Sequence, residues 1–212
     1  MKLKQNRSLI IGSKKDISKL AVKDNARLLL ISDSHGNTER FISIVNQYGK
    51  DCDALIFCGD GFVDLSVLLK SPEILTPPVI AYVQGNCDPS ELYLSGGQGG
   101  FFCGSLKAPI EQNLVVNGKK ILIVHGHAHG IDYGKEKLGL QMRLNEDEIA
   151  FYGHTHIASD QRAGNIRFIN PGSCSRPRGG QCASFAIATI GKTFVDVAFI
   201  NAESFEIWQP LN

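Results

Sequence analysis

Seven side chains that can bind metal ions occur in five short segments spread along the chain. They are Asp33, His35, Asp60, Asn86, His125, His154 and His156. Asp and Asn offer oxygen donors and His offers nitrogen donors, a mixture that suits manganese, iron, zinc and similar divalent cations. One such motif alone is weak evidence, because Asp-x-His and Gly-Asp arise often by chance. Five in succession predict a metal site, and seven ligands exceed the needs of one four- to six-coordinate ion, so we expect two metals.

Each of the five segments directly follows an apolar run that predicts a buried strand. The runs cover residues 27–32, 54–57, 79–83, 121–124 and 149–152. A helix is predicted over residues 37–49, where Asn37 can cap the start and Gly49 can end it. A strand, a helix and a strand in succession indicate an α/β fold, in which binding sites gather at the carboxyl ends of strands.

The second half of the chain contains two predicted β-hairpins. One joins residues 114–116 to 119–124 through Asn117-Gly118, a sequence that a type I′ turn favours, and the other joins 183–190 to 193–200. These antiparallel pairs predict a mixed sheet system rather than a purely parallel one.

The composition is that of an ordinary globular domain. The 212 residues are 43% hydrophobic and 20% charged, which suffices to bury a core. We divide the chain into an N-terminal extension, residues 1–26, with no assigned role and a single domain, residues 27–212. Within that domain a helix is predicted over residues 135–146, despite Gly139. A glycine-rich stretch, residues 95–104, is expected to be a mobile loop.

Charge and cysteine usage exclude several classes of partner. Lys and Arg number 22 against 21 Asp and Glu, a net charge of +1, so no global field draws the chain to nucleic-acid polymers or lipid. No stretch approaches the ~20 apolar residues that span a bilayer, and no signal peptide is visible. The six cysteines form no Cys-x-x-Cys pair, as expected of reduced thiols. We therefore expect a cytoplasmic protein without a membrane partner, and homo-oligomer formation stays open.

The ordered segments resemble the calcineurin-like metallophosphoesterases, whose pattern is Asp-x-His, Gly-Asp, Gly-Asn-His-Asp or Glu, Gly-His or Val-His, and Gly-His-x-His. The corresponding segments here read Asp33-Ser-His35, Gly59-Asp60, Gly85-Asn86-Cys87-Asp88, Val124-His125 and Gly153-His154-Thr-His156. The resemblance runs from residue 28 to 177, and Asn170-Pro-Gly-Ser173 is similar to a stretch in the small bacterial and archaeal phosphodiesterase branch. It implies an α/β fold of two stacked mixed β-sheets flanked by helices.

The resemblance also implies how the ligands divide between two divalent metal ions. One ion would be held by Asp33, His35 and His156, the other by Asn86, His125 and His154, with Asp60 bridging them. We expect manganese, with iron, zinc, nickel or magnesium as alternatives. The implied activity is that of a metal-dependent hydrolase, a phosphodiesterase that cleaves small phosphate-ester substrates with a metal-bridging hydroxide.

One departure from the family pattern concerns proton donation to the leaving group. The resemblance implies a His after Asn86 in that role, whereas this chain has Cys87, as the small branch commonly does. A thiol with a pKa of about 8.5 is a poorer donor than an imidazolium. We therefore expect a preference for good leaving groups, as in aryl or nucleotide phosphodiesters. The alternative is that Cys87 is only a small buried residue beside the site.

Other candidate residues lie near the same motifs. Asp88 and His127 join the candidate catalytic set, although His127 could instead orient metal ligands, and His129 is expected on the surface. Arg176 and Arg178 could bind the substrate phosphate through bidentate hydrogen bonds, the alternative being a solvated loop.

Three other functions compete with a small-molecule phosphodiesterase. A catalytically weak protein-interaction scaffold on the same fold would have lost metal ligands, and here every ligand position is filled. A nuclease would need a basic, aromatic-interleaved run to follow a long polymer, and none is visible in the sequence. A purely structural metal site would be rich in cysteine, and this set contains no predicted cysteine ligand.

Overall fold

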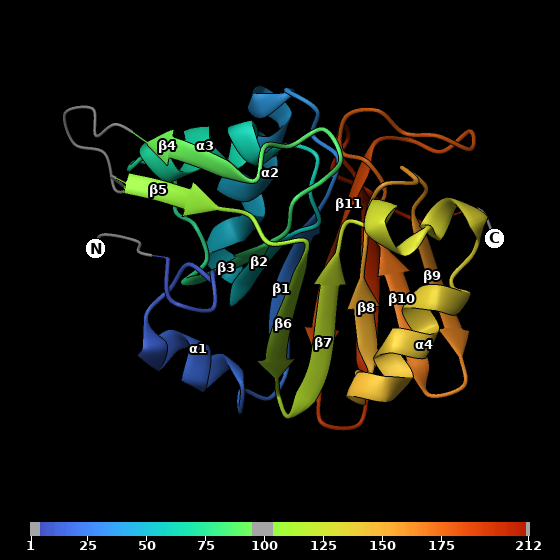
Figure 1. The fold of residues 1–212 in the computed structure, drawn as a ribbon. Helices are drawn as coiled ribbons and strands as arrows, with labels where there is room; N and C mark the ends of the chain where they lie inside the picture. Colours follow the sequence, from blue (N-terminus) through green and yellow to red (C-terminus); the bar gives the residue numbers. More distant parts are fainter. Residues whose placement is uncertain (1–4, 95–103, 211–212) are drawn as a thin grey trace.

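Two mixed β-sheets packed face to face form the centre of the molecule (Figure 1). The computed structural model describes residues 5–94 and 104–210. The first sheet has the order β13-β12-β11-β1-β2-β3, and the second has the order β6-β7-β8-β10-β9. Strands β1, β2 and β3 run parallel, whereas β11 and β12 pair antiparallel, so parallel and antiparallel pairs share one sheet. The predicted fold of two stacked mixed sheets is confirmed.

The strands of the first sheet are β1 (Ala26–Ile31), β2 (Ala54–Phe57), β3 (Val79–Tyr82), β11 (Ser184–Ile190), β12 (Val195–Asn201) and β13 (Ile207–Trp208). Those of the second are β6 (Glu111–Val116), β7 (Lys119–Val124), β8 (Ile149–Phe151), β9 (Ser159–Ala163) and β10 (Ile166–Asn170). A separate hairpin consists of β4 (Glu91–Leu94) and β5 (Gly104–Lys107). The helices are α1 (Lys14–Leu20), α2 (Thr38–Tyr48), α3 (Phe62–Lys70) and α4 (Glu136–Asn145), with 3-10 turns η1 (Gly49–Asp51), η2 (His127–His129) and η3 (Ile131–Tyr133).

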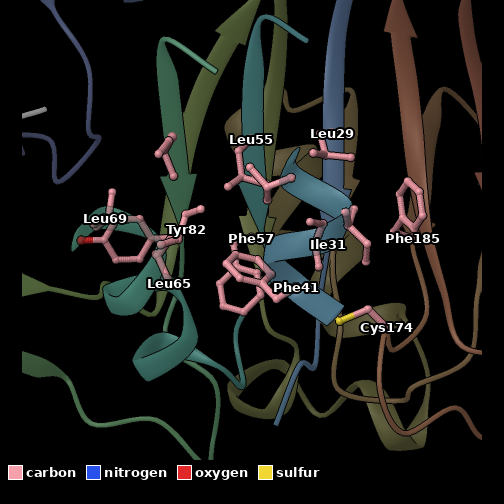
Figure 2. Close-up of a cluster of buried hydrophobic side chains, with 14 of the residues drawn as sticks. Leu29, Ile31, Phe41, Leu55, Phe57, Leu65, Leu69, Tyr82, Cys174 and Phe185 are labelled. Carbon is pink, nitrogen blue, oxygen red and sulfur yellow. The ribbon is translucent and has the colours of Figure 1, made fainter. Parts of the chain in front are cut away.

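Alternation along β1 divides its apolar side chains between two layers of core. Leu28 and Leu30 are buried in the layer between the two sheets. Leu29 and Ile31 point to the opposite face, where they join side chains of α2 and α3 (Figure 2). On the far side of the second sheet, Leu138 and Met142 of α4 are buried in a cluster with Phe168. The order of layers is therefore helix, sheet, sheet, helix, with α2 and α3 on one side and α4 on the other.

The two helices predicted from sequence are confirmed within about a residue at each end. The Asn37 side chain accepts a hydrogen bond from the N–H of Arg40 and caps α2. Gly49 ends α2 with an ordinary right-handed conformation, and the chain continues into η1. Gly139 is buried in α4, and a Cβ there would lie 3.4 Å from Phe168, an ordinary van der Waals contact, so the packing of α4 on β10 does not require the glycine.

Residues 5–26 pack against the rest of the chain. Ile11 forms an isolated β-bridge to Ile80 at the edge of β3, and Ile10, Ile11 and Leu20 are buried. The division into an extension and a single domain stays a prediction. Most of the predicted mobile loop, residues 95–103, lies outside the described residues. Over the described ranges, no helix combines the length and apolar character needed to cross a membrane.

Candidate metal centre

The loops that follow β1, β2, β3, β7 and β8 meet at one edge of the two sheets. Backbone hydrogen bonds continue past the strands: Asp33 and His35 donate to the carbonyls of Gly59 and Asp60. In the second sheet, the N–H of Gly153 donates to the carbonyl of His125. These bonds align successive loops and bring the seven predicted side chains together.

One group of donors consists of Asp33, His35 and His156. The Nε2 atoms of the two imidazoles are 3.0 Å apart, and Asp33 Oδ1 lies 3.2 Å from His156 Nε2 and 3.8 Å from His35 Nε2. Asp33 is fully buried, and its Oδ1 has no hydrogen-bond partner among the described residues. A buried carboxylate oxygen without a hydrogen-bond donor is costly unless a cation compensates it.

A second group consists of Asn86, His125 and His154. Asn86 Oδ1 lies 3.1 Å from His125 Nε2 and 2.9 Å from His154 Nδ1. Asp60 lies between the groups, because its Oδ2 is 3.5 Å from His125 Nε2 and 3.6 Å from His35 Nε2.

The chemistry of these donors fits divalent cations. Two adjacent ligands, each about 2.1 Å from an octahedral ion, are about 3.0 Å apart. The separations of 3.0 Å between His35 and His156 and of 2.9 Å between Asn86 and His154 match that distance. Without a cation or an extra proton, these nitrogen and oxygen lone pairs would face one another and repel, so the arrangement favours a bound cation.

Backbone carbonyls orient two of the imidazoles. His125 Nδ1 donates to the carbonyl of Cys58 at 2.7 Å, and His156 Nδ1 donates to the carbonyl of Arg176 at 2.6 Å. Both rings therefore turn Nε2 into the centre. His154 is held differently, because its Nε2 lies 2.7 Å from Asp132 Oδ2 and its Nδ1 faces the centre. Asp132 belongs to none of the sequence motifs and was not predicted.

Two acidic side chains hold the loops behind the ligands. Asp88 accepts hydrogen bonds from the backbone N–H groups of Asp60, Gly61, Phe62 and Gly85. Both of its oxygens accept these bonds, which orients the Asp60 loop, and the catalytic role of Asp88 stays a prediction.

Asp64 does the same for the loop after β1. This buried carboxylate accepts hydrogen bonds from the Ser34 hydroxyl, the N–H of Gly36 and the Thr38 hydroxyl. Asp64 was not predicted from the sequence, because α3 itself was not predicted and Asp64 belongs to none of the motifs.

The Asn170-Pro-Gly-Ser173 stretch ties the two sheets together below the site. Asn170 Nδ2 donates to the carbonyl of Gly153 and to Thr155 Oγ1, which supports the loop that carries His154 and His156. Ser173 Oγ donates to the carbonyl of Asp33 across the sheets.

Five of the seven ligand candidates have left-handed backbone conformations, with φ between 45° and 67°. They are Asp33, His35, Asp60, His154 and His156. Such conformations are uncommon for residues other than glycine, and they occur preferentially at functional sites. The motif glycines allow the close packing, because a Cβ on Gly85 would overlap Asp60 Oδ1 and one on Gly153 would overlap Ser32 Oγ.

Electrostatics favour an ionised Asp60. Burial alone would raise its pKa, but hydrogen bonding to His125 and to the N–H of Cys87 brings the pKa well below its usual range. Burial would likewise lower the pKa of His125, and the nearby Asp60 and Asp33 carboxylates raise it overall.

The remaining candidates lie around this centre. Cys87 is exposed, so the alternative of a small buried residue is wrong. Its thiol pKa is raised by desolvation and by the neighbouring Asp60 carboxylate. The His127 ring centroid lies 5.4 Å from that of His125 and 6.2 Å from that of His154, and desolvation and His125 lower the pKa of His127.

His129 and the two arginines flank the same loops. The expectation of an exposed His129 is wrong, because it is 3% exposed with Nε2 2.9 Å from Glu111 Oε1. The buried ring of His129 therefore has the Glu111 carboxylate as its partner. Arg176 is exposed, with Nη2 3.5 Å from the carbonyl of His35, whereas Arg178 contacts the His156 loop through its backbone N–H.

The fold and the arrangement of donors define the class of protein. Residues 27–193 match the model of the calcineurin-like phosphoesterase superfamily domain, and the chain belongs to that superfamily. Membership implies divalent metal ions, and the groups of carboxylates and imidazoles described above are candidate ligands.

Several named relatives are similar over most of their length. The chain is 33% identical to the probable metallophosphoesterase YsnB of Bacillus subtilis, covering 85% of this chain and 94% of that protein. It is 30% identical to the phosphodiesterase YfcE of Escherichia coli, covering 76% and 86% of the two chains. It is also 30% identical to the phosphodiesterase MJ0936 of Methanocaldococcus jannaschii, covering 68% of this chain and 82% of that protein.

Solved structures agree with the fold. A predicted phosphoesterase from Streptococcus pneumoniae has a TM-score of 0.66 at 27% identity, covering 86% of this chain and 92% of that one. Vacuolar protein sorting 29 of Cryptosporidium parvum has the same TM-score at 16% identity, covering 87% and 95%, and shows the fold alone.

Proposed function

We propose that this chain is a phosphodiesterase that hydrolyses small phosphodiesters with two divalent cations. The observation that carries the proposal is the pair of donor groups on either side of Asp60. Asp60 Oδ2 is nearly equidistant from an imidazole of each group, at 3.5 and 3.6 Å. In this proposal Asp33, His35 and His156 hold one cation, and Asn86, His125 and His154 hold the other. Asp60 would contribute to both positions, and manganese is the expected metal.

The bound cations would supply a water molecule ionised near neutral pH and would neutralise charge on the phosphate oxygens. The chain's own residues then bind and orient the ester. Arg176, exposed beside His35, would pair with a phosphate oxygen of the substrate. The thiol of Cys87 at the edge of the centre is a weak proton donor, which favours leaving groups that depart without protonation.

The alternative functions lack a specific supporting observation. The vacuolar protein sorting 29 neighbours are too distant in sequence to transfer more than the fold. All seven candidate ligands are present in the chain, and the net charge of +1 does not favour long nucleic acids. The cytoplasmic location stays a prediction, and homo-oligomer formation stays open.

Hydrolysis of an activated bis-aryl phosphodiester and of the corresponding monoester tests the proposal. The protein is stripped of metal, then assayed with manganese, magnesium, zinc or no addition. We expect metal-dependent cleavage of the diester in excess of the monoester. Asp60→Asn should reduce the rate by about 10²-fold or more, because it removes the negative charge between the two positions. Asp196→Asn, on β12, is the matched control and should keep full activity. Diester cleavage that persists without metal, or Asp60→Asn at wild-type rate, would overturn the proposal.

A further inference from the structure

Asp132 contacts one candidate metal ligand directly, although it lies outside every motif. Its Oδ2 atom is 2.7 Å from His154 Nε2, while His154 Nδ1 is 2.9 Å from Asn86 Oδ1. The imidazole of His154 thus lies between a carboxylate on its outer side and the donors of the centre. Metal-binding histidines commonly donate their second ring N–H to such a partner, which fixes the tautomer and the ring orientation.

The turn after β7 is built to place this carboxylate. The N–H groups of His129 and Ile131 both return to the carbonyl of Gly126, so the chain folds back on itself. Gly126 has φ 117°, and a Cβ there would lie 2.8 Å from the Ile131 side chain. Ile131 is only 6% exposed and anchors the turn in the cluster beneath α4. The next residue, Asp132, is therefore fixed at the surface and within reach of His154.

The hydrogen-bond partner of His154 on the side away from the centre differs from the partners of His125 and His156. His125 and His156 donate to neutral backbone carbonyls, whereas His154 has a carboxylate. The two donor groups also differ in charge. The first group contains the carboxylate of Asp33, but the second consists of one amide and two imidazoles. Apart from the shared Asp60, the second group has no anionic donor among the described residues.

We propose that Asp132 is a positioning residue for the second metal position, an inference that rests on the proposed two-metal function. It holds His154 as the Nε2–H tautomer, which leaves the Nδ1 lone pair free to bind a cation. It also provides, through the ring, the negative charge that the Asn86, His125 and His154 group lacks. The loss of such an outer partner typically weakens metal binding about 10–100-fold.

Calorimetric titration of the full-length, metal-stripped chain with Mn²⁺ tests this assignment. Wild type should bind two equivalents. In Asp132→Asn, one of the two should bind about 10–100-fold more weakly while the other keeps its wild-type affinity. Asp132→Glu should restore part of the lost affinity, because it returns the charge. Glu136→Gln removes an exposed carboxylate four residues away and is the matched control, with two equivalents bound as in wild type. Wild-type affinity at both positions in Asp132→Asn, or an equal loss at both, would overturn the inference.

A second readout does not depend on metal binding. Long-range ¹H–¹⁵N spectra of the metal-free chain report which ring nitrogen of His154 carries the proton. We expect a single Nε2–H tautomer in wild type and a mixture in Asp132→Asn, and the same tautomer in both would contradict the inference. If wild type failed to bind two Mn²⁺ ions, the proposed function would fail, and these spectra would still decide whether Asp132 positions His154.

Discussion

A thiol at position 87 stands at the edge of the centre, where it contacts the carboxylate between the two donor groups. The N–H of Cys87 donates to Asp60 Oδ1 at 2.8 Å, and its Sγ, a ring nitrogen of His35 and an oxygen of Asp60 lie within 4.8 Å of one another. The negative charge of Asp60 raises the pKa of this thiol beyond the effect of desolvation, so it is a poor proton donor at neutral pH. The choice of residue here should therefore control which leaving groups are tolerated.

Cys87→His should raise the turnover of phosphodiesters with poor alkyl leaving groups by about 10–10²-fold, part of the usual range for general acid catalysis. Turnover of activated aryl diesters should change little, since their leaving groups need no proton. Rates for a series of diesters with increasing leaving-group pKa measure the effect, and Cys87→Ser serves as the control without an imidazole. An unchanged slope of rate against leaving-group pKa in Cys87→His would refute this account.

The sequence pointed to the seven ligand candidates that the structure brings together, but it did not point to the side chains that support them. The ligands occur in short motifs after apolar runs, so local spacing is enough to find them. Asp64 and Asp132 act through contacts with residues 22 to 30 positions away in the chain, and nothing in their local sequence marks them. Such supports become visible only when the loops are folded together.

At the scale of elements, the loop between β2 and α3 depends on one carboxylate. Asp88 accepts four backbone N–H groups, at distances of 2.7 to 2.9 Å, and so fixes the position of Asp60. Because these four bonds hold the loop in place, replacing Asp88 tests whether it positions the loop or transfers a proton.

Asp88→Asn should lower both stability and activity. The amide turns an N–H donor toward backbone donors, so we expect a loss of about 2–3 kcal/mol in the free energy of unfolding. Urea denaturation in the presence of chelator measures it, with Asp196→Asn as the exposed control. A fully stable Asp88→Asn that lost only activity would indicate proton transfer by Asp88 instead.

The left-handed conformations of the ligand loops imply that metal binding and stability oppose each other there. His35 has φ 45°, a conformation that costs a non-glycine residue on the order of 1 kcal/mol. In metal-free protein, His35→Gly should therefore raise the free energy of unfolding by about 1 kcal/mol, although it removes a ligand. Ser43→Gly, at an exposed position within α2, should lower it by about 0.5 kcal/mol. If His35→Gly and Ser43→Gly destabilised the protein equally in the presence of chelator, the loop would not be strained.

At the scale of the whole molecule, two stacked sheets deliver ligands from opposite sides to one place. The first sheet contributes the loops after β1, β2 and β3, and the second contributes those after β7 and β8. The layer between the sheets is apolar, with Leu28, Leu30, Ile121 and Phe151 among its members. This packed apolar layer holds the two donor groups in a fixed position relative to each other.

Much of this architecture could be predicted from the sequence, because five strands and two hairpins have clear apolar runs. Helix α3 was missed, since Phe62, Leu65, Leu68 and Leu69 are all buried and leave only a weak polar face. Strand β9 was missed for the opposite reason, since it is a polar edge strand with four of its five residues exposed. Residues 5–26 are joined to β3 by the bridge at Ile11 and by the Gln5 side chain, which hydrogen-bonds Tyr82, and these long-range contacts have no local signal in the sequence.

Binding of two metal ions is tested most directly by a crystal structure of the protein grown with saturating Mn²⁺, with anomalous scattering measured to locate the ions. We expect two anomalous peaks about 3.5–4 Å apart, one on each side of Asp60. The first should be coordinated by Asp33, His35 and His156, and the second by Asn86, His125 and His154. A single peak, or two peaks that do not share Asp60, would contradict the two-metal account.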